Sequence, residues 1–346
     1  MASAPAAAID NDYSTLVESC GLLDRSERGK LALTGPDALE FLGGQVTNEL
    51  MTLHPGEGRY AAFLTHKGKM LGDLRILAVG ADEQGTPTEL LLDTERVCLQ
   101  ALFDMIRRFK VGYQVELHKR TLERGLLSLI GPAADAVLGA SADADPAGAG
   151  APGGKLASVE HANAPVVIAS SPEGDGIDAL AVRTDVGIDL ICDASDTGAL
   201  QDALRTCGAT PVGVQAAECL RVEHGRPRYG IDLDDSVIPQ EAGLNERAVS
   251  FTKGCYVGQE TVARLYYKGK PNRHLRGLRL SAPARSGEEL RLNEREVGHL
   301  SSVAISPRLG PIALALVRRE APPGSVIDVG AQGVRAEVIE LPFPSA

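Results

Sequence analysis

The chain has 346 residues, of which 23% are charged and 44% hydrophobic, and its formal net charge is −11. This composition is typical of a globular protein with two or three domains, and the acidic balance argues against a general binder of nucleic acid or membrane surfaces. No apolar run approaches the roughly 20 residues that span a bilayer. The N-terminal stretch has neither a basic region nor a long apolar core, so we expect a frayed start and a cytoplasmic location.

Two segments of the chain are alike. Leu31–Gly44 reads "LALTGPDALEFLGG", and Leu127–Ala140 reads "LSLIGPAADAVLGA". Each predicts a short strand, a Gly-Pro turn and a helix, followed by two strand regions and a second helix. The repeated strand–helix–strand–strand–helix order predicts two duplicated α+β halves. The alternative is that Gly-Pro turns recur by chance.

Two further regions have a distinct composition. Gly139–Lys155 is dominated by Ala, Gly, Pro and Asp, which bury little apolar surface, so we expect a mobile loop. From about Asn272 the chain becomes a series of short alternating runs separated by Gly, Pro or Ser. This pattern predicts a small β-barrel or β-sandwich.

The cysteines are too scattered to indicate a metal site. They form no Cys-x-x-Cys pair, and no histidine cluster lies beside them, so neither a zinc site nor a self-held iron–sulfur cluster is expected. In a long cytoplasmic chain we expect free thiols. The six cysteines are Cys20, Cys98, Cys192, Cys207, Cys219 and Cys255.

One cysteine has a particular setting, in the stretch "FTKGCYVGQETVAR" at Phe251–Arg264. The pattern predicts a helix that begins near Gln259, which places Cys255 just before a helix N-terminus and close to Lys253. A helix dipole and a nearby cation both favour the thiolate over the thiol, so the residues predict a reactive Cys255. The alternative is a small side chain that fills a tight turn.

Charged residues follow on the same helix and beyond it. Glu260 and Arg264 are spaced i, i+4, so they can form an ion pair on one helix face. The stretch Arg264–Arg279 then contains no acid, and it is either a solvated linker or a docking surface for an anionic tail. Its basic residues are Arg264, Lys268, Lys270, Arg273, Arg276 and Arg279.

The cysteine stretch resembles the signature Lys-Gly-Cys-Tyr-x-Gly-Gln-Glu-x-x-x-Arg of the YgfZ family of folate-binding proteins. That family lies within the glycine-cleavage T-protein (aminomethyltransferase) superfamily. The similarity extends to "FLGGQVTNEL", to the "LTHKGKMLGDLRI" hairpin, to "RVEHGRPRYGID" and to the C-terminal "EVGHLSSVAISPRLGPIALALV". The matching positions of the signature are Lys253, Gly254, Cys255, Tyr256, Gly258, Gln259, Glu260 and Arg264.

The resemblance implies a three-lobed, T-protein-like α+β architecture with two duplicated halves around a central channel for tetrahydrofolate. Residues 1–55 and 118–270 then form interleaved folate-binding lobes, and residues 56–117 complete the first half. Residues 271–346 form the C-terminal β-barrel. The glutamates of a folate become candidate occupants for the basic stretch.

The resemblance also implies a function. The protein is expected to bind tetrahydrofolate or a one-carbon derivative, and to help assemble or repair iron–sulfur clusters in client enzymes, such as a tRNA-modifying methylthiotransferase. Cys255 is the functional thiol in this hypothesis, and we expect a monomer with no intrinsic metal. The alternatives are a folate-dependent aminomethyltransferase and a binding module without catalysis.

Four residues are candidates for contact with the folate. The resemblance implies that Asp73 keeps one of two carboxylates that the transferase has in its hairpin, whereas Gly72 replaces the other, which argues against aminomethyl transfer. Asp189 matches the carboxylate that accepts hydrogen bonds from the pterin, but it is alternatively a solvated strand residue. Thr47 and Asn48 line the same pocket or simply cap their turn.

Overall fold

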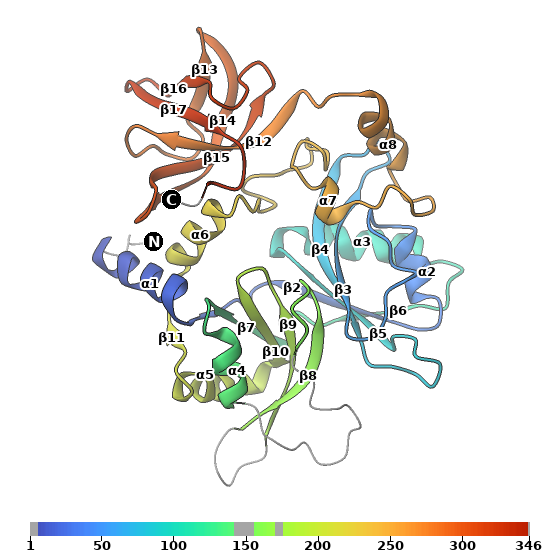
Figure 1. Cartoon of the computed structure of the whole chain (residues 1–346). Coiled ribbons are helices and arrows are strands. Elements are labelled where there is room, and N and C mark those ends of the chain that lie inside the picture. The colour runs from blue at the N-terminus through green and yellow to red at the C-terminus, as the bar shows by residue number, and fades with distance from the viewer. Residues whose placement is uncertain (1–5, 142–155, 170–175, 345–346) are drawn as a thin grey trace. The chain divides into compact units, whose positions relative to one another are not determined.

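The computed structural model describes residues 6–141, 156–169 and 176–344 (Figure 1), so most of the loop predicted at Gly139–Lys155 lies outside the described residues. The division into three parts expected from the sequence stays a prediction. By its internal contacts the chain forms two compact units. The first unit is Met1–Gly43, Glu49–Ala61 and Leu74–Val214, and the second is Gly44–Asn48, Ala62–Asp73 and Gln215–Ala346.

The two halves predicted from the sequence repeat the same order of elements. The first half contains β2 (Gly29–Thr34), α2 (Ala38–Gly43), β3 (Gly58–Leu64), β4 (Met70–Val79), β5 (Glu89–Thr94) and α3 (Leu99–Phe109). The second half contains β7 (Arg124–Ile130), α4 (Ala134–Ser141), β8 (Asn163–Ile168), β9 (Ile177–Arg183), β10 (Gly187–Asp193) and α5 (Thr197–Thr206). A short 3₁₀ turn precedes α3 and α5, at Arg96–Cys98 and Ala194–Asp196.

Each half has three strands between its helices where the sequence predicted two, because the longer apolar run folds back on itself. Between β3 and β4, Gly68 has a φ of +75° and donates its N–H to Thr65 O at 2.9 Å. Between β9 and β10, Thr184 N–H donates to Gly187 O at 2.9 Å. Glycine adopts such turns at little cost, so each run becomes a hairpin.

The order of the strands confirms the duplication. One sheet has the order β3-β4-β5-β2-β6, and the other has β8-β9-β10-β7-β1-β11. The two orders correspond strand for strand, but the outer strands are exchanged. β1 (Gly21–Asp24) precedes the first half in the sequence, yet it pairs within the second sheet. β6 (Glu116–Lys119) follows the first half and is the last strand of the first sheet. β11 (Thr210–Pro211) is a short edge strand of the second sheet.

The N-terminal segment expected to be frayed contains a helix, α1 (Ala6–Glu18). Tyr13 and Leu16 are buried and stand three residues apart, so one face of α1 is packed. Leu16 packs tightly against Gly21 on β1, where a Cβ would lie 2.4 Å from Leu16 Cδ2. The apolar contacts of this face stabilise the segment that composition alone marked as unstructured.

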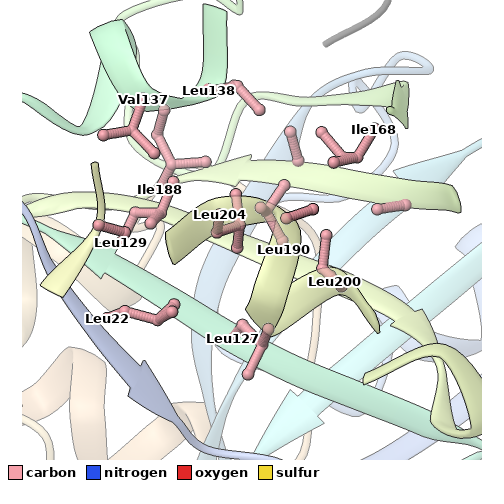
Figure 2. Close-up of a cluster of buried hydrophobic side chains, with 14 of the residues drawn as sticks. Leu22, Leu127, Leu129, Val137, Leu138, Ile168, Ile188, Leu190, Leu200 and Leu204 are labelled. Carbon is pink, nitrogen blue, oxygen red and sulfur yellow. The ribbon is translucent and has the colours of Figure 1, made fainter. Parts of the chain in front are cut away.

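Helices α4 and α5 cover one face of the second sheet. Figure 2 shows Val137 and Leu138 of α4, and Leu200 and Leu204 of α5, in one cluster with side chains of the strands. Burial of large aliphatic side chains of this kind contributes roughly 1.5–3 kcal/mol for each of them. The strand residues of this cluster include Leu22, Leu127, Leu129, Ile168, Ile188 and Leu190.

The opposite faces of the two sheets pack against each other within the first unit. Their contact is an apolar layer made by side chains from both sheets. The buried members of the layer are Ala32, Leu77 and Leu91 from the first sheet, and Leu126, Val182 and Ile191 from the second.

A buried ion-pair network crosses between the same two sheets. Asp93 on β5 accepts hydrogen bonds from Arg28 Nε at 2.8 Å, Arg28 Nη2 at 2.9 Å and Arg75 Nε at 2.7 Å. Arg75 on β4 also donates from Nη1 to Asp189 Oδ2 at 2.6 Å. Asp189 on β10 accepts a second bond from Ser128 Oγ on β7, at 2.6 Å. One chain of charge-assisted hydrogen bonds therefore joins the first sheet to the second.

The C-terminal region is a closed six-stranded barrel, as predicted. Its strands pair in the order β12-β15-β14-β13-β16-β17, and Figure 1 shows them in orange and red. Closure leaves no free sheet edge, and the interior is filled by alternating aliphatic residues such as Leu278, Leu290 and Val338. The strands are β12 (Arg273–Leu280), β13 (Glu289–Leu292), β14 (Arg295–Ser306), β15 (Gly310–Arg318), β16 (Val326–Val329) and β17 (Val334–Ile339).

Three further helices lie between the second half and the barrel in the sequence. They are α6 (Val214–Glu223), α7 (Asn245–Ala248) and α8 (Gln259–Lys268). None of the helices in the described part of the chain is long and apolar enough to cross a membrane.

Opposing effects act on the pKa of Asp93. Burial alone raises this pKa, but the guanidinium groups of Arg28 and Arg75 outweigh burial and hold the pKa well below its ordinary value. Because the folded-state pKa is lowered, Asp93 contributes stability above the unfolded-state pKa, and this contribution is lost as the pH falls through the folded-state pKa.

We expect Asp93→Asn to lower the free energy of unfolding by about 3 kcal/mol, because it leaves buried guanidinium groups short of negative charge. Asp193→Asn is the matched control. Its ion pair with Arg124 is largely exposed, so its loss is expected to cost less than about 1 kcal/mol. Urea unfolding measures both values.

The stability of the parent chain should also depend on pH. Below a pH of about 4 the parent chain should lose stability more steeply than Asp93→Asn, and equal acid sensitivity of the two chains would contradict this role of Asp93.

Candidate functional site

The signature cysteine lies on an exposed loop before α8. The helix begins at Gln259, and its N-cap, Gly258, has a φ of +85°. A Cβ at Gly258 would lie only 2.5 Å from Thr65 O in the β3–β4 turn, so only glycine fits this close approach. Cys255 stands three residues before this fixed point, and its side chain is exposed to solvent.

Lys253 anchors the other side of the loop. Its Nζ donates hydrogen bonds to Val46 O at 2.7 Å and to Asn48 O at 2.8 Å. It also lies 5.2 Å from the ring centroid of Tyr256, a geometry that permits a cation–π contact. The ammonium group of Lys253, which the sequence placed beside Cys255, therefore binds two backbone carbonyl oxygens of the segment 44–48.

Thr47 and Asn48 lie against the segment that leads into the signature. Thr47 Oγ donates to Ala248 O at 2.6 Å and accepts from Ala62 N–H at 2.9 Å. Asn48 Nδ2 donates to Arg247 O at 3.3 Å. These bonds, with those of Lys253, join residues 44–48 to the signature segment, so the structure brings these candidate residues together. Their role in folate binding stays a prediction.

Two other signature residues have structural contacts. Tyr256 is buried, and burial raises the pKa of its hydroxyl to about 12, so the phenol stays neutral at physiological pH. Gln259 donates from Nε2 to Gly254 O at 3.4 Å, which links the two ends of the short loop that contains Cys255. Gly254 itself has open space around its Cα, since a Cβ there would have no heavy atom within 4 Å.

The ion pair that the sequence allowed between Glu260 and Arg264 is not formed among the described residues, although both lie on α8 with the predicted spacing. Both side chains are exposed, and an exposed pair gains too little to fix two long side chains. Within the basic stretch, Arg273 instead pairs with Glu241 at 3.1 Å, and Arg276 pairs with Glu340.

The two carboxylates proposed for folate binding have different surroundings. Asp73 is buried on β4, in the same compact unit as the signature. Asp189 is buried on β10 in the other unit, where both of its oxygens accept hydrogen bonds from Arg75 and Ser128. Asp189 is thus not a solvated strand residue, and its proposed contact with a pterin stays a prediction.

Three side-chain oxygens near the signature segment were not singled out from the sequence. Gln45 Oε1, Gln240 Oε1 and Asn245 Oδ1 are buried, and they have no hydrogen-bond partner among the described residues. All three lie in the second unit. Gln45 had a signal in the sequence, its position in the family-like stretch "FLGGQVTNEL", and Gln240 and Asn245 lie in the segment that precedes the signature. Buried acceptors without a partner are uncommon, and they suit a ligand that carries N–H donors.

The six cysteines differ in exposure, and all of them are free thiols. Burial raises the pKa of Cys20 to about 11, and burial with the adjacent Glu223 raises that of Cys219 to about 12. Cys255 is the exposed one. Among the residues described, no group of three or more His, Cys, Asp or Glu side chains is arranged to hold a metal ion.

Comparisons with known proteins agree with this architecture. The GCVT N-terminal domain family matches residues 3–253, and the glycine cleavage T-protein C-terminal barrel domain matches residues 273–344. The chain therefore belongs to the glycine-cleavage T-protein superfamily.

Its relatives cover nearly the whole chain. The aminomethyltransferase of Geobacillus kaustophilus is 30% identical over 97% of this chain and 90% of its own length. That of Streptomyces coelicolor is 30% identical over 93% of this chain and 86% of its own. The crystal structure of the glycine cleavage system aminomethyltransferase T from Bartonella henselae has the same fold, with a TM-score of 0.80, 24% identity, and coverage of 97% of this chain and 89% of that chain. The names of these relatives favour the transferase alternative over the iron–sulfur hypothesis.

We expect Cys255 to be the thiol that reacts fastest in the folded protein. With Ellman's reagent at neutral pH, Cys255→Ser should remove the fast phase, because four of the other five thiols are buried and the fifth, that of Cys207, is only partly exposed. Cys219→Ser should keep the fast phase and lower only the number of thiols counted after denaturation. A fast phase that survives in Cys255→Ser would contradict the assignment.

The two glycines beside the cysteine are expected to differ in their tolerance of a side chain. Gly258→Ala combines a left-handed backbone with the contact to Thr65 O, so we expect a loss of about 2 kcal/mol or more of unfolding free energy. Gly254→Ala has open space and should change stability by less than about 0.5 kcal/mol. Urea unfolding of both variants tests this, and equal losses would show that Gly258 does not constrain the loop.

Proposed function

We propose that this protein binds tetrahydrofolate and transfers a one-carbon unit, as an aminomethyltransferase of the T-protein type. Its membership of the superfamily and the names of its relatives support this proposal. The observation that carries it in the structure is the buried carboxylate of Asp73, in the same unit as the signature segment and the unpartnered amide oxygens. A buried carboxylate of this kind can hold an amine in place or accept a proton from it.

The residues present fit a pterin ring. A pterin has a 2-amino group and an adjacent ring N–H, which are donors, and the unpartnered oxygens of Gln45, Gln240 and Asn245 are acceptors. Tetrahydrofolate, when bound, supplies the amine nitrogens that carry the one-carbon unit. The part of this chain is to orient those nitrogens, to hold or accept a proton at the carboxylate of Asp73 and to exclude water from them.

A second function is favoured by a different observation, the exposed thiol of Cys255 on a loop fixed at both ends. Aminomethyl transfer has no use for a thiol that faces solvent. In the second proposal, the folate-bound protein is an accessory factor in the manner of the YgfZ family, and Cys255 meets an iron–sulfur client enzyme, such as a tRNA-modifying methylthiotransferase. Support comes from the match of the signature and from the accessibility of the thiol.

One set of variants separates the two functions. Tetrahydrofolate is titrated calorimetrically, without oxygen, into the parent chain, Asp73→Asn and Cys255→Ser, and formation of methylenetetrahydrofolate from an aminomethylated lipoyl carrier protein is then measured. For a transferase we expect turnover by the parent and by Cys255→Ser, and a fall of about 100-fold or more in Asp73→Asn, because misplacement of the reacting amine is costly.

The opposite pattern supports the accessory function. In that case the parent binds tetrahydrofolate but forms no methylenetetrahydrofolate, and Cys255→Ser fails to restore client activity in a deletion strain. Unfolding midpoints of both variants control for stability. If the parent does not bind tetrahydrofolate at all, both proposals fail.

A further inference from the structure

One arginine of the first unit lies beside the buried ion-pair network without joining it. Arg25 follows β1, and its backbone N–H donates to Leu126 O at 2.8 Å. Because Leu126 belongs to the apolar layer between the two sheets, this bond holds Arg25 at their junction. The network groups whose charges act on its guanidinium are Arg28, Asp189, Glu95 and Arg75.

The guanidinium of Arg25 has no partner in the part of the chain that the structure describes. It donates no hydrogen bond and forms no ion pair there, whereas Arg28 and Arg75 bind the carboxylates of the network. Arg25 is only partly exposed, yet its nitrogens are not among the sealed side-chain atoms that lack a partner. These N–H donors are therefore open to solvent, and a ligand can reach them.

Positive charge is in excess around Arg25. Lys30 is fully buried, and its Nζ donates to two backbone oxygens, those of Ser26 and Arg28, both at 3.0 Å. Asp24 and Glu27 are also near Lys30, but both are exposed, so water screens their charges. Four cations thus surround three carboxylates. The cations are Arg25, Arg28, Lys30 and Arg75, and the carboxylates are Asp93, Glu95 and Asp189.

These surroundings disfavour the charge of Arg25. Burial and the neighbouring guanidinium groups of Arg28 and Arg75 lower the pKa of Arg25, and the nearby carboxylates oppose this only in part. An arginine nevertheless stays protonated in a protein. The side chain therefore keeps a positive charge that no group of the described chain contacts directly.

We propose that Arg25 is the centre of a binding site for an oxyanion, a carboxylate or a phosphate, at the junction of the two sheets. A guanidinium offers parallel N–H donors that match two oxygens of either group. The bound oxyanion completes the network, since it supplies the fourth negative charge. This site is independent of the proposed folate binding, because Asp73 and the signature lie in the other unit.

Urea unfolding at neutral pH tests the proposal with two probes, inorganic phosphate and acetate, at an ionic strength held constant with sodium chloride. A probe that binds only the folded chain raises the folded-to-unfolded ratio about 11-fold at ten times its Kd. We expect a saturable rise of this kind in the parent and none in Arg25→Gln. General stabilisation by excluded salts grows steadily with concentration instead. A larger response to phosphate assigns a phosphate ligand, and a larger response to acetate assigns a carboxylate.

Two further variants serve as controls. Arg107 is exposed on α3 in the same unit, so Arg107→Gln removes an equal charge and should keep the full response. Arg25→Lys keeps the charge but loses the paired donors, so its response should be weaker than the parent's. Without added oxyanion, Arg25→Gln should be at least as stable as the parent, because it removes a charge without a partner.

The proposal is overturned if neither probe gives a saturable rise in the parent, or if Arg25→Gln keeps the parent's response. A clear loss of stability in Arg25→Gln without added oxyanion also contradicts it, since the protein's own groups would then already stabilise the charge.

Discussion

The pairing of Asp93 with Arg28 and Arg75 is the constraint on which the duplicated halves depend. A charge placed between two packed sheets is stable only if every partner is in position, because desolvation costs several kcal/mol for each ion. Arg75 and Asp93 are opposite one another on neighbouring strands, as are Asp189 and Ser128. A shift of one of these strands by one residue relative to its neighbour would move its side chain to the other face of the sheet. The network therefore links the strand register of both sheets to their packing.

This constraint bears on the folate proposal through Asp189. Its two oxygens already accept hydrogen bonds from Arg75 and Ser128, yet a carboxylate has about four acceptor positions in all. A pterin that used Asp189 would therefore bind to a carboxylate whose position is already fixed by the network. Such preorganisation lowers the cost of binding, since the protein need not order the side chain when the ligand arrives.

Local patterns in the sequence predicted the halves and the barrel, whereas pairings between distant residues could not be predicted. The two Gly-Pro segments and the short alternating runs depend on near neighbours, and they are found where expected. The exchange of β1 and β6 between the sheets, and the partners Glu241 and Glu340 of Arg273 and Arg276, join residues far apart in the chain. Likewise, the missing Glu260–Arg264 pair shows that correct helical spacing does not suffice when solvent competes.

The residues of the signature fall into two groups: anchors, which contact the protein's own backbone, and residues whose side chains face solvent. Lys253 and Gly258 are held by the backbone of residues 44–48 and of the β3–β4 turn, and Gln259 closes the loop. These contacts account for the anchors as structural residues, without reference to a ligand. They do not account for Cys255, Glu260 or Arg264, whose side chains face solvent. A loop constrained at both ends that presents a thiol outward is organised for something that approaches from outside, and this is the physical reason to test Cys255 apart from the folate chemistry.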